Sequence, residues 1–119
     1  MARVLLVGYI PKMLQERERL LRAAGYDVTV AVSFATAASI IPQEPIDVAI
    51  FGYTVPETER NHLAAALKDA WPSSKIIIRY LTSINNTELA DALMPTTATP
   101  EEILRAVNHL VSKSREKLA

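Results

Sequence analysis

Side chains that could do chemistry are few in this chain, and their spacing brings no set of them together. The chain has no cysteine, which excludes disulfides, thiolate catalysis and zinc sites built on cysteine. His62 and His109 are far apart and lack a Ser, Cys or Asp at nucleophile spacing, so we expect them to be structural. Glu57 and Glu59 are candidates for acid–base chemistry or weak metal ligation. Acidic residues just after Pro56 are, however, typical of a solvated helix N-terminus, where the helix dipole favours them.

Tyr9, Tyr53 and Tyr80 are three of the four tyrosines, and each is predicted at the carboxyl end of a buried strand. Ligands of open α/β sheets bind beyond those strand ends. One interpretation is therefore a hydroxyl-lined cleft that binds a small molecule or a partner side chain. The alternative, which we favour, is that the aromatic rings only fill space, because close packing needs no ligand.

The stretch DVAIFGYTVPE, residues 47–57, ends a buried strand in Gly52, which offers no side chain for chemistry. The three glycines of the chain match neither GxGxxG nor a P-loop, so no phosphate-binding loop is expected. Arg79 is unusual, because the buried strands of parallel sheets are normally wholly apolar. It reaches a sheet edge, pairs with an acid or binds an anion, and the pattern does not choose among these three.

Runs of Val, Leu and Ile predict the strands that position these residues, and apolar residues at helical spacing predict the helices between them. The strands are expected at 3–7, 27–32, 45–51, 75–81 and, as a short one, 92–95. The helices are expected at 12–24, after Pro11 and with Gly25 as the stop, at 34–41 after a Ser33 cap, at 60–71, as a short helix within 82–92, and from a capping box at Thr99 and Glu102 to about Lys117.

Strands that alternate with helices imply an α/β fold, a doubly wound parallel sheet with right-handed crossovers and helices on both faces. A flavodoxin-like strand order, 2-1-3-4-5, is the common solution at this size. It places the first and third strands side by side at the switch point. With 119 residues, 50% hydrophobic content and no linker, we expect a single domain over residues 1–119.

The overall charge is balanced, with thirteen basic and thirteen acidic residues, so no net field attracts nucleic acid or an anionic membrane. The N-terminal MARVLLVGYI has only a short apolar run before Pro11, which fits neither a signal peptide nor a membrane span. We therefore expect a cytoplasmic protein that recognises protein partners through a local surface, with no nucleic acid and no membrane partner.

The chain resembles the receiver domain of bacterial two-component response regulators over almost its whole length. The segments that carry the resemblance are RVLLVGYIP, RERLLRAAGYDVTVA, PIDVAIFGYTVPE, KIIIRYL and TPEEILRAV. The resemblance implies a CheY-like, (βα)5 flavodoxin-like fold. In this family an acidic pair after the first strand holds Mg²⁺ and an Asp after the third strand accepts a phosphoryl group. A Thr or Ser after the fourth strand and a Lys after the fifth bind that group.

Carried onto this chain, those functional positions fall on residues of a different chemistry. The acidic pair falls on Gly8 and Tyr9, the phosphoacceptor on Gly52, the Thr or Ser on Tyr80 with Thr82 two residues on, and the Lys on Thr96. These residues offer neither the carboxylates nor the cation, so the resemblance implies a degenerate pseudo-receiver with no phosphorylation site, no metal and no cofactor. The segment from Tyr80 to Thr96 is shorter than in typical members, which predicts a shortened helix before the fifth strand.

The resemblance predicts a signalling domain of two-component systems or phosphorelays, not an enzyme, that acts by phosphorylation-independent protein–protein interaction. In the family, the fourth helix, fifth strand and fifth helix form the surface for dimers and output contacts, so a homodimer through that surface is expected. One alternative is a small-ligand sensor or enzyme that uses the tyrosine-lined cleft. Another is residual phosphotransfer to a displaced acceptor such as Thr54 or Glu57.

Overall fold

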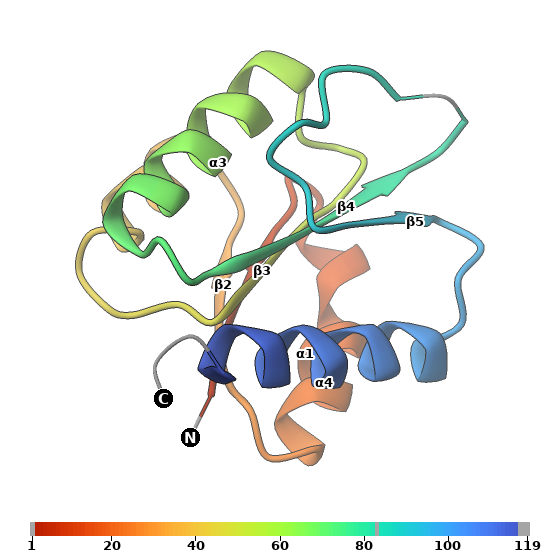
Figure 1. Cartoon of the computed structure of the whole chain (residues 1–119). Coiled ribbons are helices and arrows are strands. Elements are labelled where there is room, and N and C mark those ends of the chain that lie inside the picture. The colour runs from red at the N-terminus through yellow and green to blue at the C-terminus, as the bar shows by residue number, and fades with distance from the viewer. Residues whose placement is uncertain (1, 83, 117–119) are drawn as a thin grey trace.

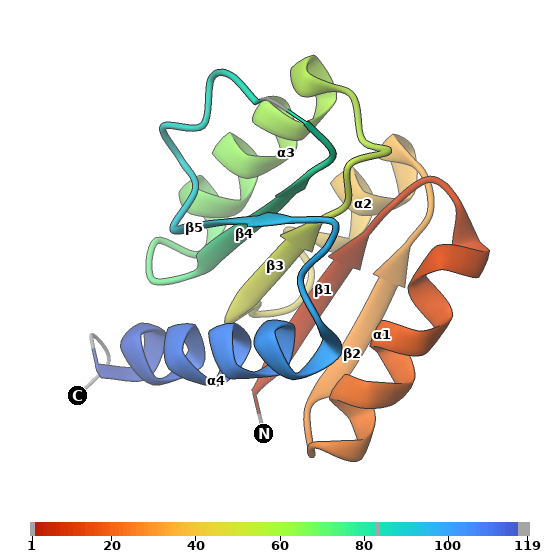
Figure 2. The same ribbon diagram turned by 90° about the vertical axis from the view of Figure 1, so that its right-hand side faces the viewer.

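The computed structural model describes residues 2–82 and 84–116, which form an open sheet with helices on both faces (Figures 1 and 2). The strands are β1 (Arg3–Val7), β2 (Asp27–Ala31), β3 (Val48–Phe51), β4 (Lys75–Tyr80) and β5 (Ala92–Pro95). The helices are α1 (Pro11–Ala23), α2 (Phe34–Ile40), α3 (Glu57–Ala70) and α4 (Pro100–Glu116). Within the described ranges, no helix is long and apolar enough to cross a membrane.

The five strands of the described residues are parallel and lie in the order β2-β1-β3-β4-β5. β1 pairs with β2 on one side and β3 on the other, so that Leu5 lies opposite both Thr29 and Ala49. Helices α1 and α4 cover one face of the sheet, and α2 and α3 cover the other (Figure 2). The fold class and the strand order predicted from the sequence are confirmed.

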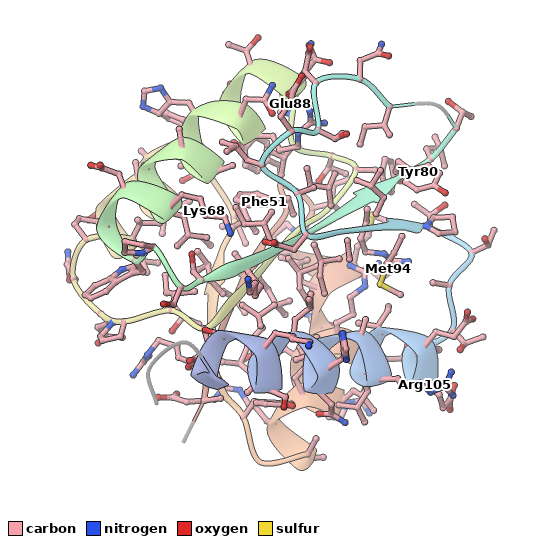
Figure 3. The ribbon with its side chains drawn as sticks, in the orientation of Figure 1. Phe51, Lys68, Tyr80, Glu88, Met94 and Arg105 are labelled. Atoms are coloured by element: carbon pink, nitrogen blue, oxygen red, sulfur yellow. The ribbon has the colours of Figure 1, made fainter. Side chains whose placement is uncertain are left out.

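The central strands are apolar because both of their faces are covered, and every residue of β3 is buried. Successive side chains of a strand point to opposite faces. Leu5 and Phe51 therefore belong to the core layer under α2 and α3, and Leu6 and Ile50 to the layer under α1 and α4. Phe51 lies between the sheet and α3 (Figure 3). Burying each such side chain stabilises the fold by about 1.5–3 kcal/mol, which favours this register over a slipped one.

Local chemistry sets the helix boundaries near the N-terminus. Pro11 is the first residue of α1, where a helix needs no N–H donor. Gly25 follows α1 with a φ of +96°, a conformation that glycine adopts without strain. Before α2, the Ser33 hydroxyl accepts a hydrogen bond from the Thr36 N–H at 3.1 Å, as the predicted cap requires.

The segment between β4 and β5 differs from the prediction. A short helix was expected within 82–92, but the described residues there form turns, bends and irregular backbone before β5 begins at Ala92. The described part of the chain therefore has four helices, where the alternation of strands and helices predicted five. The reason is local, because Asn and Thr side chains compete for backbone hydrogen bonds and Asn86 takes a left-handed φ of 55°.

In the absence of that helix, contacts of Asp91 hold the chain where it returns to the sheet. Its Oδ2 accepts hydrogen bonds from the Ile76 N–H at 2.8 Å and from Lys68 Nζ at 2.9 Å. Its own N–H donates to the Ile76 carbonyl at 2.8 Å. A carboxylate paired with both a strand and α3 fixes where β5 starts beside β4.

Thr99 and Glu102 form the predicted capping box at the start of α4. The Thr99 N–H donates to Glu102 Oε1 at 2.9 Å, and the Glu102 N–H donates to Thr99 Oγ1 at 3.1 Å. These hydrogen bonds with Thr99 lower the pKa of the Glu102 carboxyl. The helix reaches Glu116, and Lys117, its predicted end, lies outside the described residues.

We predict that Thr99→Ala lowers the free energy of unfolding by about 1 kcal/mol, because one first-turn N–H of α4 loses its acceptor. Chemical denaturation followed by circular dichroism measures the change. Thr97→Ala, at an exposed neighbouring position, is the control and should leave stability unchanged. Equal stability of the two variants would show that the capping box contributes nothing.

Candidate functional site

The carboxyl ends of the strands form one edge of the sheet, and the residues singled out from the sequence lie along it. These are Gly8 and Tyr9 after β1, Gly52 and Tyr53 after β3, Tyr80 as the last residue of β4, and Thr96 after β5. Backbone hydrogen bonds continue the sheet to this edge, since the Gly52 N–H donates to Val7 O at 2.8 Å and the Thr96 N–H to Tyr80 O at 2.9 Å. The edge is therefore the candidate functional site.

The two glycines at this edge differ in the space around them. A Cβ on Gly52 would come no closer than 3.4 Å to the Val7 carbonyl, so a side chain there is sterically possible. A Cβ on Gly8 would lie 2.9 Å from Cδ2 of Leu14, which is buried on α1. Leu14 therefore occupies the place that a side chain at position 8 would take, and makes that part of the edge apolar.

Tyr9 turns towards α3. Its hydroxyl donates to Glu59 Oε1 at 2.5 Å, and its backbone N–H donates to Thr54 Oγ1 at 2.9 Å. Burial, together with the hydrogen bond and the negative charge of Glu59, raises the pKa of Tyr9 well above its usual value. Tyr9 therefore stays protonated at neutral pH and holds both Glu59 and Thr54 in structural roles.

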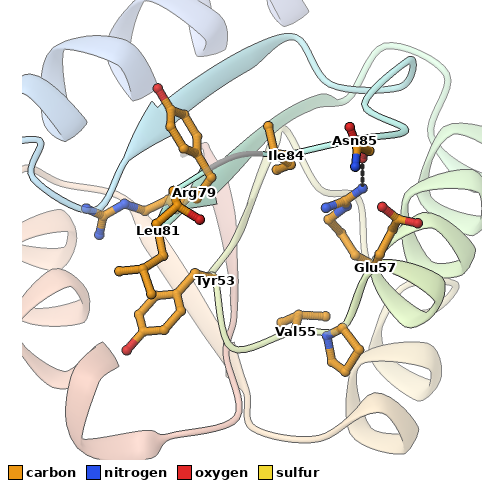
Figure 4. A pocket seen from close by; sticks show the side chains of 12 residues that line it. Tyr53, Val55, Glu57, Arg79, Leu81, Ile84 and Asn85 are labelled. Carbon is orange, nitrogen blue, oxygen red and sulfur yellow. Dashed lines mark hydrogen bonds between the residues drawn. The ribbon is translucent and has the colours of Figure 1, made fainter.

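A pocket of about 340 Å³ opens between the segment after β3, the end of β4 and the chain that follows β4 (Figure 4). Tyr53 and Tyr80 line it, together with Thr82, whereas Tyr9 is not among its lining residues. The structure thus brings two of the three tyrosines to one pocket. Tyr53 is 39% exposed, and its hydroxyl contacts the sulfur of Met13 at 3.8 Å.

Arg60 of α3 closes one side of this pocket. Its side chain is 5% exposed, and its Nη2 donates to the carbonyl oxygens of Asn85 at 2.8 Å and Asn86 at 2.9 Å. The hydrogen bond to Asn85 is visible in Figure 4. Asn86 in turn donates from Nδ2 to Glu57 Oε2 at 2.8 Å. These contacts hold the segment that replaces the expected helix against the N-terminal turn of α3.

Arg79 is the arginine of the buried strand β4 whose role the sequence left open. It is 3% exposed, and none of the ion pairs found among the described residues includes it. Its side chain runs to the carboxyl edge, where Nη2 donates to Pro95 O at 3.2 Å. Burial, and secondarily the charge of Arg17, lowers the pKa of Arg79 to about 10. The guanidinium therefore keeps its charge at neutral pH.

The histidines do not join this edge. His62, on α3, packs its ring against that of Phe34, with the ring centroids 5.4 Å apart. His109 is exposed on α4. Glu57 and Glu59 occupy the first turn of α3, the position that the helix dipole favours for acids.

The residues at the edge do not fit the Mg²⁺ site of the family that the sequence resembles. Mg²⁺ binds oxygen ligands, mainly carboxylates, in octahedral geometry, and positions 8, 9 and 52 carry no carboxylate. Within residues 2–82 and 84–116, no group of three or more His, Asp or Glu is placed to hold a metal ion. The donors here suit hydrogen bonding, not cation binding.

No family model matches the chain, and no curated protein matches its sequence. Solved structures match it over nearly its whole length. A CheY-like response regulator receiver domain protein from Methanospirillum hungatei has a TM-score of 0.87 at 21% identity, with 98% of each chain covered. One from Clostridium thermocellum has a TM-score of 0.82 at 22% identity, covering 99% of this chain and 98% of the other. The chain has a receiver-domain fold.

The same fold also occurs in a structure described as an adenylate cyclase from Rhodopirellula baltica. Its TM-score is 0.82 at 19% identity, and 98% of this chain and 95% of that one are covered. At such identities the likeness shows the fold alone. The receiver-domain fold is typical of signalling domains, and it leaves the chemistry at the edge to the residues that this chain places there.

Sequence reasoning missed Arg60 and the filling role of Leu14. A signal for Arg60 was present, because Arg60, Leu63, Ala64 and Leu67 recur at helical spacing and all are buried. An arginine on the inner face of a helix indicates a buried polar partner. Leu14 carried no comparable signal, because only the receiver-domain fold brings α1 against the end of β1.

We predict that Arg60→Met loosens the segment between β4 and β5. The Asn85 and Asn86 carbonyls lose a charged donor, and such hydrogen bonds are worth roughly 1.5–3 kcal/mol. Amide hydrogen exchange of Ala90 and Asp91, whose N–H groups are bonded, should become about tenfold faster or more. Arg105→Met, at an exposed position of α4, is the control. Unchanged exchange at Ala90 and Asp91 would contradict the role of Arg60.

Proposed function

We propose that residues 1–119 form a single receiver-like signalling domain that works by protein–protein interaction and without being phosphorylated. The observation that carries this proposal is Gly52, at the place where the resembled family has its phosphoacceptor Asp. The room beside Gly52 admits a side chain, so glycine is not demanded by packing there. The chain keeps the scaffold and lacks the nucleophile.

The neighbouring groups support the same proposal. Phosphoryl transfer to a carboxylate needs a metal or other cations to offset the charge that develops on the phosphoryl group. Gly8 and Tyr9 supply no metal ligands of the required kind, and Thr96 supplies no cation. Thr54 and Glu57, the candidates for a displaced acceptor, already accept hydrogen bonds from the Tyr9 N–H and from Asn86. We therefore propose no phosphotransfer and no other catalytic activity.

We predict that acetyl phosphate with Mg²⁺ leaves the intact mass of the protein unchanged. Gly52→Asp should also stay unlabelled, because the metal ligands and the cation remain absent. A receiver domain that retains all of these groups is the positive control, and it should gain one phosphoryl group under the same conditions. A phosphorylated form of the wild-type chain would refute the proposal.

The partner surface that we propose lies where the expected helix is missing. Right-handed crossovers that proceed across the sheet in the same direction place their helices on the same face. The steps from β3 to β4 and from β4 to β5 proceed in the same direction, so a helix between β4 and β5 would lie beside α3. Ala92 and Met94 of β5 pack against the core layer under α4, and Figure 3 shows Met94 on that side. Leu93 therefore points to the α3 side. Leu93 is 45% exposed there, and Leu89 in the preceding segment is 39% exposed.

The occupant that we propose for this surface is a second copy of the chain. β5 is an edge strand that pairs only with β4 among the described strands. Pro95 has no backbone donor, which disfavours further strand addition at this edge. Contact through Leu89 and Leu93 is therefore favoured over a continuous sheet between the two copies.

We predict that Leu93→Asp weakens self-association by roughly tenfold or more, because an isologous contact places the new charge twice in one apolar interface. Sedimentation velocity over a concentration series measures the dissociation constant. Val32→Asp is the matched control. Val32 is 41% exposed and follows β2, the outer strand on the side of the sheet away from β5. A wild-type protein that stays monomeric throughout would contradict the homodimer and leave a different protein as the partner.

A second candidate function, binding of a small ligand, is favoured by the pocket beside Tyr53 and Tyr80. A space of about 340 Å³ falls within the range of ligand sites. Amide shifts at Tyr53, Tyr80 and Asn85 during an NMR titration with a panel of nucleotides and metabolites would support this function. If the amides of these residues show no shifts, protein–protein contact remains the only function proposed.

A further inference from the structure

Arg79 is a buried cation with few partners. Besides the hydrogen bond from Nη2 to Pro95, its Nε is buried without an acceptor. A buried guanidinium is unfavourable unless a negative group pairs with it. Figure 4 shows that Arg79 extends away from the pocket beside Tyr53, towards α1 and α4.

A crevice of about 170 Å³ lies on that side, between α1 and the segment that joins β5 to α4. Arg79 lines it from β4, Arg17 from α1, and Thr96 and Ala98 from the joining segment. Arg79 also lines the pocket beside Tyr53 and a space of about 10 Å³ next to Gly52, which holds at most one water molecule. Gly52, at the position of the family's phosphoacceptor, is not among the residues that line the crevice.

Arg17 brings a second cation to the crevice. It is half-buried, and it takes part in none of the ion pairs found among the described residues. Burial lowers the pKa of Arg17, and the charge of Arg17 contributes to the lowered pKa of Arg79. Two like charges that face one partly buried space repel each other, and an anion between them would stabilise both.

We propose that this crevice binds a small oxyanion, phosphate or carboxylate, between the guanidinium groups of Arg17 and Arg79. The planar fork of a guanidinium matches two oxygens of either anion. Thr96 also lines the crevice, and a threonine hydroxyl is a further hydrogen-bond donor for an anion. This binding goes beyond the proposed function, because it requires neither a protein partner nor the loss of phosphorylation.

Glu16 is the group that opposes binding. It lines the crevice from α1, one position before Arg17, and it is exposed. With two guanidinium groups against one carboxylate, the crevice keeps a net positive charge. Removal of this carboxylate should therefore tighten anion binding, whereas removal of either arginine should weaken it.

The test is an NMR titration of the whole chain with inorganic phosphate and, separately, with acetate. Ionic strength is held constant with sodium chloride so that screening does not change. We expect saturable shifts at the Thr96 and Ala98 amides and at the Arg79 Nε–H for at least one of the two anions. The anion with the lower dissociation constant identifies the chemical source.

Four variants decide whether the crevice is the site. Arg17→Met should raise the dissociation constant about tenfold or more, since a charged hydrogen bond is removed. Arg79→Lys keeps the charge without the fork and should also weaken binding. Glu16→Gln should strengthen binding, and Arg19→Met, an exposed cation on the same helix, is the control that should leave it unchanged.

The proposal is overturned if neither anion gives saturable shifts, or if Arg17→Met binds as tightly as the wild type. Arg17 is only half-buried, so this variant remains decisive even if Arg79→Lys fails to fold. Failure here is distinguishable from failure of the proposed function, which the acetyl phosphate and self-association measurements test.

Discussion

The parallel pairing of β3 with both β1 and β4 is the constraint on which the rest of the molecule depends. Every residue of β3 is buried, so its backbone donors and acceptors must find their partners within the sheet. Parallel neighbouring strands can be connected only by crossovers, which carry the chain from the carboxyl end of one strand back to the amino end of the next. All carboxyl ends therefore meet at one edge, and Gly8, Gly52 and Tyr80, far apart in sequence, become neighbours there.

In the correspondence that we propose, that shared edge carries residues of a different chemistry from those of the resembled family. Where the family has carboxylates for a cation, this chain has two glycines, and Leu14 fills the space beside one of them. The buried charges nearest the edge are instead the guanidinium groups of Arg60 and Arg79. Arg60 donates to two backbone carbonyls and to the Asn61 side-chain oxygen. Arg79 donates from Nη2 to Pro95 O, and its buried Nε has no hydrogen-bond partner among the described residues. The buried charges at this edge are thus cationic, in keeping with the anion site that we propose.

The absence of a helix between β4 and β5 affects both the hydrogen bonding of that segment and the surface that is exposed beside it. Because irregular backbone cannot satisfy its own polar groups, side chains from α3 and from the segment itself do so. Arg60 binds two of its carbonyls, and Asp91 ties its end to β4 and to Lys68. The same loss of a helix leaves Leu93 exposed on the α3 side of β5. One local change in helix propensity therefore alters both the pocket and the face that we propose for a partner.

Much of the fold could be predicted from the sequence, because its signals are local. The continuous apolar strands, the Ser33 cap, Gly25 and the Thr99–Glu102 box each act within a few residues, and the structure confirms them. The alternation of strands and helices then leaves few arrangements for a parallel sheet. The absence of carboxylates at the strand ends was also evident from residue types.

The tertiary structure alone decided which side chains share a space. Tyr9 was grouped with Tyr53 and Tyr80 because all three lie at the carboxyl ends of strands. The hydroxyl of Tyr9, however, is bonded to Glu59 on α3. Arg79 had three possible roles, and only the packing of α1 and α4 against β4 places it beside Arg17 in a common crevice. Such contacts depend on the direction and burial of side chains from distant segments, which spacing along the chain does not encode. The sequence thus predicted most of the elements and the residue types at the strand ends, and three-dimensional packing decided which side chains lie together.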